Sequence, residues 1–494
     1  MSLEDLPSRM LIDGAFREGR ERLEVFNPAN GTAFASVSLA DETMAAEALA
    51  AARRAQPAWA ATAPLRRAEI MREIARLIRA DAERYARLIV REQGKTIKEA
   101  RGEVGGAAGF FDFFAEFARR IEGQILPSDF PGEQIWIQRV PVGVVAAIIP
   151  WNYPFALVAR KVAPALIAGD TIVLKSHEET PLSALAMAQI FDRAGVPAGV
   201  VNILTGTGPV VGEALCTSPE VDLITMTGSV PTGKRIMGNA AANLTPVSLE
   251  LGGKAPFIVM ADSDLDLAVR SAATSRYMNC GQVCICNERT YVQRPIYDAF
   301  VERFLEVSRT LRVGDPMNEA TDIGPKVNAR ELEKVEARVA EAIADGAELL
   351  MGGSRPQPSP VDGGYYYQPT VLTGLRPDMR ILRDETFGPV VPIVPFDDFE
   401  EAVLQANDSR YGLSAYLFTN DLQKVMRAVG EIAFGEIYVN RIGPESLQGF
   451  HTGYRESGPG GDDGSHGLDK YLRRKTVYVN YSGGATAPLM PYSG

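Results

Sequence analysis

Short apolar runs alternate with helical segments from residue 142 onward, and this alternation restricts the possible folds more than any other feature. The apolar runs are Val142–Ile149, Thr171–Lys175, Val200–Leu204 and Leu223–Met226, and helical spacing recurs between them, as in Leu157–Ala168 and Leu182–Ala194. Strands that are joined by helical crossovers lie parallel, and helices then cover both faces of their sheet. The pattern therefore predicts an α/β fold built on a parallel sheet.

A second α/β unit is expected later in the chain, because 494 residues exceed what one hydrophobic core normally supports. The alternation restarts with an apolar strand at Arg289–Gln293 and a helix at Tyr297–Leu311, whose apolar residues repeat on one face. We place the start of this unit between residues 254 and 270. The chain is therefore predicted to contain at least two α/β domains.

Three other segments have patterns of their own. Residues 41–120 repeat apolar side chains at helical spacing, and Asp41 is suited to cap the first of the helices. Gln134–Arg139 and Thr476–Tyr481 instead alternate apolar and polar residues, which is typical of strands with one buried face. We expect these strands to add edges to a sheet shared between subunits, and the tail after Ser482 to be coil.

Charge and hydropathy argue against two classes of partner. The formal net charge is −11, so the protein as a whole repels nucleic acid and anionic lipid. The longest apolar stretch, Val142–Val158, is interrupted by Pro150, Asn152 and Pro154, which favours a core strand over a membrane span. Met1–Asp5 lacks the positive and apolar regions of a secretory signal. We therefore expect neither a nucleic-acid partner nor a membrane partner.

The four cysteines, at positions 216, 280, 284 and 286, are too few and too closely grouped for a disulfide framework. Their number predicts a protein of a reducing compartment, the cytoplasm. Cys280, Cys284 and Cys286 could form part of a metal site, but Cys-x-x-x-Cys-x-Cys is not a common zinc spacing and no histidine lies nearby in the sequence. We expect no bound metal.

Two glycine-containing turns are the first candidate binding feature. Gly206-Thr-Gly208-Pro-Val-Val-Gly212 follows one apolar strand, and Thr227-Gly228-Ser229 follows the next. Glycines permit tight turns, and a helix start capped by Ser229 offers amide donors and a positive dipole end to a pyrophosphate. The first turn is one residue longer than the usual fingerprint, so a plain strand-to-helix turn is the alternative. Together the turns predict a dinucleotide site that includes Gly208, Gly212, Gly228 and Ser229.

Lys175 and Glu178 extend this candidate site at the end of a neighbouring strand. Lys175 is placed to reach a ribose or a phosphate, and Glu178 is placed to accept hydrogen bonds from ribose hydroxyls. An acidic group at that position repels a 2′-phosphate, which favours NAD over NADP. The alternative is a solvated pair of charges in a loop.

A thiol nucleophile and its base form the second candidate feature. Cys284 lies in Gly-Gln-Val-Cys, which favours an exposed loop, although a lone cysteine is often buried and structural. A free thiol is mostly protonated at neutral pH, so it needs activation. The only histidines, His177, His451 and His466, lie outside motifs that look catalytic. Glu250 precedes two glycines that allow close backbone approach, so it is the candidate base, with a surface carboxylate as the alternative.

Asn152 is a candidate for stabilising a developing oxyanion. It lies in Pro150-Trp151-Asn152-Tyr153-Pro154, directly after a buried strand. Its side-chain amide can donate a hydrogen bond to a negatively charged oxygen. The alternative is a turn residue that bonds backbone groups between the two prolines.

Taken together, these motifs resemble the aldehyde dehydrogenase superfamily, and the resemblance covers nearly the whole chain. The matching motifs, in the family's order, are Pro150-Trp151-Asn152, Lys175, Gly228-Ser229, Glu250-Leu-Gly-Gly, Gly281-Gln-Val-Cys284 and Glu385-Thr-Phe387-Gly-Pro. The resemblance implies a Rossmann-like coenzyme domain (residues 1–121 and 142–253) and an α/β catalytic domain (254–452). It also implies a small β oligomerisation arm (122–141 and 470–494) that joins subunits into homodimers or homotetramers.

The resemblance also implies roles for individual residues. In such enzymes the residue matching Cys284 attacks the aldehyde, and the residue matching Asn152 holds the oxyanion together with the cysteine's backbone amide. Hydride then passes to the nicotinamide, and the residue matching Glu250 activates the water that hydrolyses the thioester. Relatives that transfer the acyl group to coenzyme A generally lack this base, so the resemblance implies hydrolysis. The positions that match coenzyme contacts are Trp151, Lys175, Glu178, Ser229, Glu385 and Phe387.

Within the superfamily, the chain looks most like the group that oxidises lactaldehyde and glycolaldehyde. Arg160, Glu445 and His451 match positions that line the substrate pocket of that group, which suits a small aldehyde bearing a hydroxyl or an anion. For each of the three, a surface or interface residue is the alternative. Two other functions remain open: oxidation of another short aldehyde, such as a semialdehyde or sulfolactaldehyde paired with Arg160, and a catalytically silent nucleotide-binding scaffold.

Overall fold

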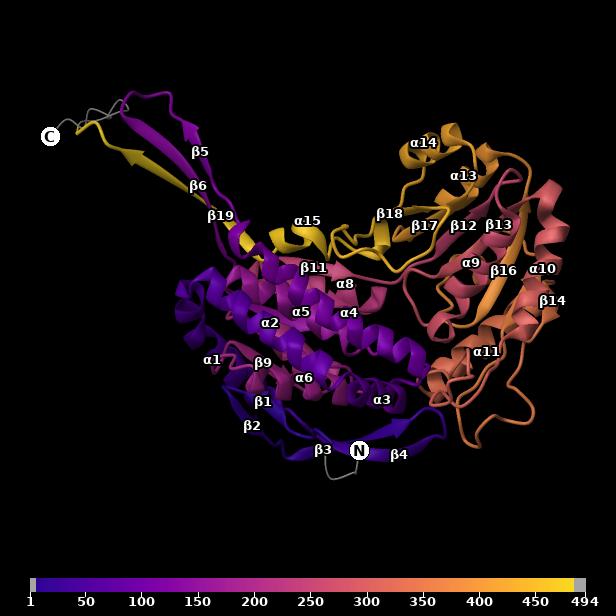
Figure 1. Ribbon diagram of the computed structural model, residues 1–494, viewed down its shortest axis with the longest axis horizontal. Coiled ribbons are helices and arrows are strands. Elements are labelled where there is room, and N and C mark those ends of the chain that lie inside the picture. Colours follow the sequence, from indigo (N-terminus) through magenta and orange to yellow (C-terminus); the bar gives the residue numbers. More distant parts are fainter. Residues whose placement is uncertain (1–5, 484–494) are drawn as a thin grey trace.

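The computed structural model describes residues 6–483, which form two seven-stranded sheets with helices packed on them and a three-stranded arm (Figure 1). The first sheet carries the earlier half of the chain, and the second sheet carries most of the later half. The arm projects away from both (Figure 1). The predicted α/β fold with two sheets and a β arm is confirmed.

The first sheet has the strand order β11-β10-β7-β8-β9-β1-β2. Its strands are β1 (Met10–Ile12), β2 (Ala15–Arg17), β7 (Val144–Ile148), β8 (Thr171–Lys175), β9 (Val201–Leu204), β10 (Leu223–Thr227) and β11 (Val247–Glu250). The five strands from β11 to β9 are parallel, and four of them, β7, β8, β9 and β10, are the alternating apolar runs that the sequence predicts, whereas β11 was not predicted. Ile148 pairs with Lys175 and Thr227 pairs with Glu250, so the carboxyl ends of these strands lie in register along one edge.

Helices pack on this sheet as the sequence pattern predicts. They are α1 (Glu42–Ala61), α2 (Pro64–Ala80), α3 (Ala82–Gln93), α4 (Ile97–Ala115), α5 (Ala156–Ala168), α6 (Pro181–Arg193), α7 (Glu213–Thr217) and α8 (Val230–Ala240). The Asp41 side chain accepts a hydrogen bond from the Met44 amide and begins α1, as expected. Thr96 and Glu99 form a capping box at the start of α4.

The second sheet has the order β14-β15-β16-β13-β12-β17-β18 and is parallel except at β14. Its strands are β12 (Ala255–Val259), β13 (Asn287–Gln293), β14 (Glu348–Met351), β15 (Thr370–Thr373), β16 (Val390–Phe396), β17 (Ser414–Phe418) and β18 (Glu436–Val439). The accompanying helices are α9 (Leu265–Tyr277), α10 (Tyr297–Thr310), α11 (Ala329–Ala344), α12 (Arg380–Arg383), α13 (Phe399–Asn407) and α14 (Leu422–Glu431). β12 begins within the interval predicted for the second unit.

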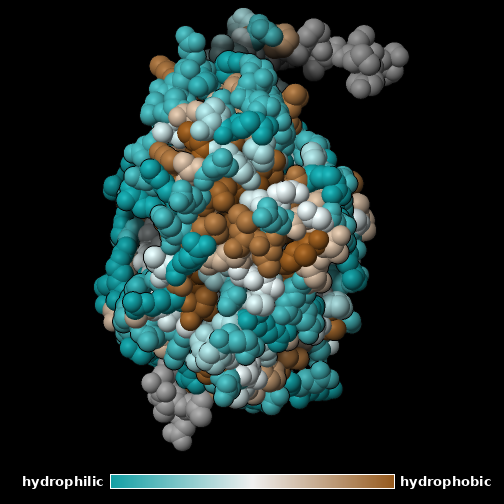
Figure 2. Space-filling model, turned by 90° about the vertical axis from the view of Figure 1, so that its right-hand side faces the viewer, coloured by the Kyte–Doolittle hydropathy of each residue, from teal (hydrophilic) through white to brown (hydrophobic). Residues whose placement is uncertain are grey.

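Only part of the apolar face predicted for helix α10 is buried in the core. Phe300 and Phe304 are fully buried, whereas Val301 and Leu305 are partly exposed beside β14. Figure 2 shows the side of the molecule where α10 and β14 lie in Figure 1, and an apolar area near its centre is surrounded by hydrophilic surface. One helical face therefore serves both the core and the surface.

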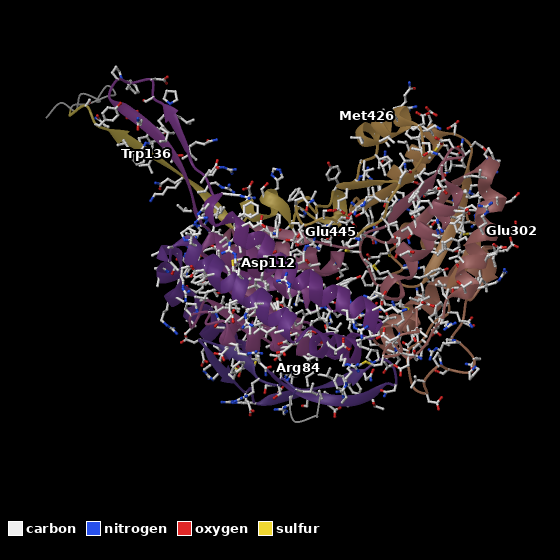
Figure 3. The ribbon with its side chains drawn as sticks, viewed as in Figure 1. Arg84, Asp112, Trp136, Glu302, Met426 and Glu445 are labelled. Carbon is white, nitrogen blue, oxygen red and sulfur yellow. The ribbon has the colours of Figure 1, made fainter. Side chains whose placement is uncertain are left out.

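The arm consists of β5 (Gln124–Pro127), β6 (Glu133–Pro141) and β19 (Leu472–Asn480), in the order β19-β6-β5. Thr476 pairs with Ile137 in antiparallel register, so the two alternating segments predicted as strands are neighbours. Trp136 lies on this arm (Figure 3). A short helix, α15 (Gly464–Asp469), precedes β19. The sharing of this sheet between subunits stays a prediction.

Two features of the fold were not predicted from the sequence. Residues before Asp41 form the β1–β2 hairpin and a second hairpin of β3 (Glu21–Asn27) and β4 (Thr32–Leu39).

The expected coil after Ser482 falls mainly on residues 484–494, and Met1–Asp5 precedes Leu6, so both segments lie outside the described residues. Among residues 6–483, no helix has the length and apolar character needed to cross a membrane.

Candidate active site

The candidate site lies where the carboxyl ends of the first sheet's parallel strands meet the start of the second sheet. β7 leads to Asn152, β8 ends at Lys175, and β11 ends at Glu250. Ligands of open α/β sheets bind at this edge, because loops after neighbouring parallel strands converge there. The sheet register therefore brings together motifs that are up to a hundred residues apart in the sequence.

Cys284 lies on a tightly folded loop between α9 and β13. Asn279, Cys280 and Gly281 all have positive φ, at 48°, 55° and 72°, and a Cβ at Gly281 would lie 2.2 Å from the Gly388 carbonyl oxygen. The loop is thus held in a conformation that ordinary residues rarely adopt. Cys284 is partly exposed, whereas Cys280 and Cys286 are buried. Burial raises the pKa of Cys280 to about 11 and that of Cys286 to about 12, which leaves Cys284 as the accessible thiol of the cluster.

Two glycines bring the segment after Glu250 against this loop. A Cβ at Gly253 would lie 2.4 Å from the Cys284 carbonyl oxygen, and a Cβ at Gly252 would lie 2.5 Å from a Glu385 carboxylate oxygen. No side chain fits at either position without moving backbone or a functional carboxylate. The close approach that the Glu-Leu-Gly-Gly motif predicted is therefore present, and it links the candidate base to the candidate nucleophile.

Glu250 is a buried carboxylate rather than a surface residue. Its exposed fraction is 2%, and neither of its oxygens has a hydrogen-bond donor among the described residues. Burial raises the pKa of Glu250 to about 7, although His451, Lys161 and Lys470 favour the charged form. A carboxylate with free oxygens and a pKa near neutrality is suited to take a proton from water.

Asn152 lies directly beside the nucleophile loop. Its side-chain amide donates to the Gln282 carbonyl oxygen over 3.0 Å, two residues before Cys284. An asparagine amide has two N–H groups, so one remains for a substrate oxygen. The reading as a simple turn residue does not account for a buried side chain that reaches across to this loop.

A buried ion pair holds Asn152 in place, and the sequence analysis missed it. Lys95 and Glu103 are fully buried and lie 2.5 Å apart. Lys95 Nζ donates to the Asn152 carbonyl oxygen over 2.9 Å, and Glu103 accepts from the Phe155 amide over 2.8 Å. Lys95 lies in the turn between α3 and α4, and Glu103 lies on α4, in a region where charged residues are common on the solvated surface. No local signal distinguishes them.

The predicted coenzyme residues from distant motifs also lie together. The rings of Trp151 and Phe387 meet edge to face at 5.5 Å, and Glu385 accepts from the Gly253 amide over 2.9 Å. Phe387 has a positive φ of 54°. Buried Glu288 accepts hydrogen bonds from the Thr386 and Phe387 amides, both over 2.8 Å, and so holds this loop.

Residues at the end of β8 meet the glycine turn after β9. Glu178 accepts from the Gly208 amide over 2.7 Å and lies 3.5 Å from Lys175 Nζ. Gly208–Gly212 forms a single π-helical turn before α7, which explains why its glycine spacing differs from the usual fingerprint. Burial opposes ionisation of Glu178, but Lys175 and His177 outweigh it and keep the pKa below its usual value. An ionised carboxylate and a cation thus flank this turn.

The second predicted turn, Thr227-Gly228-Ser229, differs from the sequence prediction in the hydrogen bond of its serine. Ser229 occupies the cap position of α8, but its hydroxyl contacts Thr232 Oγ1 at 2.9 Å and makes no capping bond to the helix backbone. The predicted serine cap is therefore wrong, and the amides at the start of α8 are not occupied by that side chain. The Gly228 amide donates to the Glu250 carbonyl oxygen over 2.9 Å, which places this turn beside the candidate base.

These observations fit a bound dinucleotide. The start of α8, where Ser229 makes no capping bond, leaves backbone amides of the kind that pyrophosphate binding requires. Glu178 offers acceptor oxygens for ribose hydroxyls. The edge-to-face pair of Trp151 and Phe387 offers aromatic surface of a kind suited to a nicotinamide ring, and Glu385 lies in the same loop as Phe387.

His451 is the main surprise of the site, because the sequence motifs did not point to a catalytic histidine. It is buried, with Nε2 3.8 Å from Glu250 and Nδ1 3.1 Å from Glu436. Burial and Arg160 oppose its positive charge, but Glu445, Glu436 and a hydrogen bond with the Cys284 side chain hold the pKa of His451 well above its usual value. A cationic imidazole therefore lies between the nucleophile and the base.

Arg160 and Glu445, predicted to line the substrate pocket, lie next to His451. Arg160 Nη2 is 2.5 Å from Glu445 Oε1, which in turn is 3.9 Å from His451 Nδ1. Figure 3 shows Glu445 between the parts of the molecule built on the two sheets. The three residues thus form one cluster beside Cys284 rather than separate surface contacts.

The Gly458–Gly467 segment contributes two acidic residues that sequence reasoning did not single out. Asp462 bonds Lys161 Nζ at 2.7 Å, and Asp463 bonds Arg160 Nε at 3.0 Å. Both carboxylates are buried. Both lie in a glycine-rich turn without a motif that marks them, so tertiary contacts alone reveal them.

Comparison with known proteins agrees with this geometry. A model described as "Aldehyde dehydrogenase family" matches residues 16–477. The chain is 46% identical over 475 residues to the 3,6-anhydro-alpha-L-galactose dehydrogenase of Vibrio sp. (strain EJY3), covering 96% of this chain and 99% of the relative. It is 47% identical over 475 residues to the lactaldehyde dehydrogenase of Escherichia coli (strain K12), covering 95% and 98%.

A solved structure extends the match to three dimensions. The structure of 3,6-anhydro-L-galactose dehydrogenase in complex with NAP has a TM-score of 0.94 at 45% identity, covering 96% of this chain and 100% of that chain. Similarity over almost the full length of both chains applies to both sheets and the arm together. The protein belongs to the aldehyde dehydrogenase family and is an NAD(P)-dependent aldehyde dehydrogenase.

Proposed function

We propose that this enzyme oxidises a small hydroxyaldehyde, such as lactaldehyde or glycolaldehyde, to its carboxylic acid with NAD as the preferred coenzyme. The observation that carries the proposal is the single cluster in which Cys284, Glu250 and the polar residues Arg160, Glu445 and His451 lie together. Charged and hydrogen-bonding groups beside the nucleophile suit a substrate hydroxyl, because buried polar groups disfavour analogues that leave them unpaired.

In the first half of the reaction, the Cys284 thiolate attacks the aldehyde carbon and forms a tetrahedral adduct. The free N–H of the Asn152 amide donates to the adduct oxygen, and the Lys95–Glu103 pair keeps Asn152 in position. The His451 side chain forms a hydrogen bond with the Cys284 side chain and so helps to orient the nucleophile. A bound nicotinamide supplies the acceptor for the hydride that leaves the adduct.

In the second half, the thioester on Cys284 is hydrolysed. Glu250 accepts a proton from water, which then attacks the acyl carbon and releases the acid and the free thiol. Burial supports this role, because it raises the pKa of Glu250 to about 7, near the pH at which the base works. The complete set of nucleophile, oxyanion donor and base favours this route over acyl transfer to coenzyme A.

NAD preference rests on Glu178. Its carboxylate lies at the turn where the adenosine ribose of a dinucleotide binds in related α/β sheets, and it is held in the ionised form beside Lys175. A 2′-phosphate at this position would face a negative charge.

A panel of aldehydes assayed with both coenzymes tests the proposed substrate class. We expect kcat/KM for lactaldehyde or glycolaldehyde to exceed that for succinic semialdehyde by about tenfold or more, a barrier difference of about 1.4 kcal/mol. NAD is expected to be preferred over NADP. A tenfold preference for succinic semialdehyde would contradict the proposal.

A second candidate substrate is 3,6-anhydro-L-galactose, which is also an uncharged hydroxylated aldehyde. It is favoured by the 46% identity to the Vibrio sp. enzyme that bears its name. Including this sugar in the panel separates the two candidates, because a larger substrate needs room that lactaldehyde does not occupy.

A pH profile tests the proposed base. Because the Glu250 pKa is about 7 and only the carboxylate accepts a proton, the rate of thioester hydrolysis is expected to rise about tenfold from pH 6 to pH 8 and then level off. Acyl-enzyme breakdown after a single turnover measures this step directly. A hydrolysis rate that is flat from pH 6 to pH 8 would rule out Glu250 as the titrating base.

We also propose that the division into domains follows the three largest sheets. The coenzyme domain is residues 1–121 and 142–253, the catalytic domain is 254–452, and the arm of residues 122–141 and 470–494 joins subunits. The arm supports this proposal, because Ile125 and Tyr478 on it are 71% and 67% exposed. Apolar side chains on a projecting sheet are typical of a surface that a partner covers.

A further inference from the structure

Arg160 is the arginine of the pocket cluster to which an anionic aldehyde would bind, yet its guanidinium group is already bound. It lies on α5 with its side chain 11% exposed. Glu445 and Asp463 each form an ion pair with it, and Asp462 lies 3.7 Å from its Nε. Two carboxylates thus engage the guanidinium directly, and a third lies just beyond.

Three carboxylates accompany the two cations of the cluster beside Cys284. The cations are Arg160 and His451, and the carboxylates are Glu436, Glu445 and Asp463. The neighbouring Asp462 bonds both Lys161 and Lys470, so the positive charge of those lysines is directed to Asp462 rather than to Arg160. A substrate anion entering beside Arg160 would therefore meet carboxylates on either side of the cation.

Asp463 is held in a backbone conformation that favours glycine. Its φ is 66° and its ψ is 169°, a region where non-glycine residues are strained. It is flanked by Gly460, Gly461 and Gly464, so glycine is common in this turn. The side chain is 1% exposed and points to Arg160. A strained residue that places a buried carboxylate against Arg160 is expected to have a function beyond forming the turn.

We propose that Asp463 is a specificity-determining residue: by binding Arg160 together with Glu445, it cancels the positive charge that an anionic aldehyde requires and restricts the enzyme to uncharged hydroxyaldehydes. The inference rests on the proposed function and narrows it. It excludes semialdehydes of dicarboxylic acids and sulfonated aldehydes as good substrates. Glu445 and Asp463 retain acceptor lone pairs, which suit donation from a substrate hydroxyl.

The test replaces Asp463 but keeps one carboxylate paired with the Arg160 guanidinium. In Asp463→Asn, the substituted side chain is nearly isosteric with aspartate and carries no charge. Asp463→Gly relieves the strain and serves as a second variant. Glu445 remains in both, so Arg160 is not left as an unpaired buried charge. Asp469→Asn, a change at a partly exposed carboxylate six residues further on that pairs with Arg139, is the matched control.

We expect both Asp463 variants to raise the ratio of kcat/KM for succinic semialdehyde to that for lactaldehyde by about tenfold, equivalent to about 1.4 kcal/mol, mainly through a lower KM for the anion. Succinate is also expected to inhibit both variants at about tenfold lower concentration than it inhibits the wild type. Asp469→Asn should leave both values unchanged.

The outcomes separate this inference from the proposed function. If the wild type oxidises lactaldehyde, glycolaldehyde or the anhydro sugar well but neither variant changes the ratio or succinate inhibition, Asp463 does not determine specificity. If the wild type prefers succinic semialdehyde, the proposed function fails first. A loss of activity on every aldehyde, without a change in the ratio, would assign Asp463 a structural role only and overturn the inference.

Discussion

Cys284→Ala is expected to abolish aldehyde oxidation, lowering kcat by about four orders of magnitude or more. The reason is chemical: without the sulfur no covalent adduct forms, and Cys280 and Cys286 cannot substitute because both are buried and their pKa values are raised. Initial rates of NADH formation with a preferred aldehyde measure the loss.

Coenzyme binding provides the necessary contrast for this variant. Removal of one partly exposed sulfur leaves the turns after β9 and β10 intact, so NAD is expected to bind Cys284→Ala about as tightly as the wild type. Cys216→Ala is the matched control, since Cys216 is a buried cysteine on α7 outside the site. Activity of Cys284→Ala within tenfold of the wild type would show that the nucleophile lies elsewhere.

Glu250→Gln is expected to separate the two halves of the reaction. Acylation and hydride transfer need Cys284 and Asn152, whereas hydrolysis needs a base, so the variant should release about one NADH per active site and then nearly stop. We expect steady-state turnover to fall by about 10²–10⁴-fold, the usual contribution of general base catalysis. Rapid-mixing absorbance and mass spectrometry of the trapped acyl-enzyme measure the burst and the intermediate.

The neighbouring His451 is a poor substitute base in that variant. Its pKa is held well above the usual value, so near neutral pH it carries a proton and cannot accept another. Glu213→Gln, which changes a carboxylate in a surface pair with Arg235, is the matched control. Steady-state turnover near the wild-type rate in Glu250→Gln would place the base elsewhere, and a slow reaction without a burst would place the limiting step before hydrolysis.

Much of the fold was predictable because the signals were local. The alternation between Val142 and Met226 predicted strands that the structure places at β7, β8, β9 and β10, since a strand buried on both faces needs a continuous apolar run. The two hairpins before Asp41 were missed although turn dipeptides mark both: Asp13-Gly14 separates β1 from β2, and Asn30-Gly31 lies between β3 and β4. The predicted serine cap at Ser229 failed for a different reason: a cap position can be read from the sequence, but the partner of the hydroxyl cannot.

Some residues of the site could likewise be named from local sequence signals, and others could not. Cys284, Glu250 and Asn152 stand in motifs with glycine or proline neighbours, so they could be named from the sequence. Lys95 lies between two helices, and Asp463 lies in a glycine-rich turn, where each resembles a solvated charge in the sequence. Only their burial and their contacts in the structure, Lys95 with Asn152 and Asp463 with Arg160, show that they belong to the site.

The sequence by itself determined the α/β class, the nucleophile and base candidates and their order along the chain, because periodicity and close-packing glycines act over a few residues. The tertiary structure alone decided that His451 lies between Glu250 and Cys284, and that Arg160 is neutralised rather than free. The physical reason is distance. Ionisation and charge compensation depend on groups a few ångströms apart in space, and Arg160 and Asp463 are separated by about three hundred residues of chain.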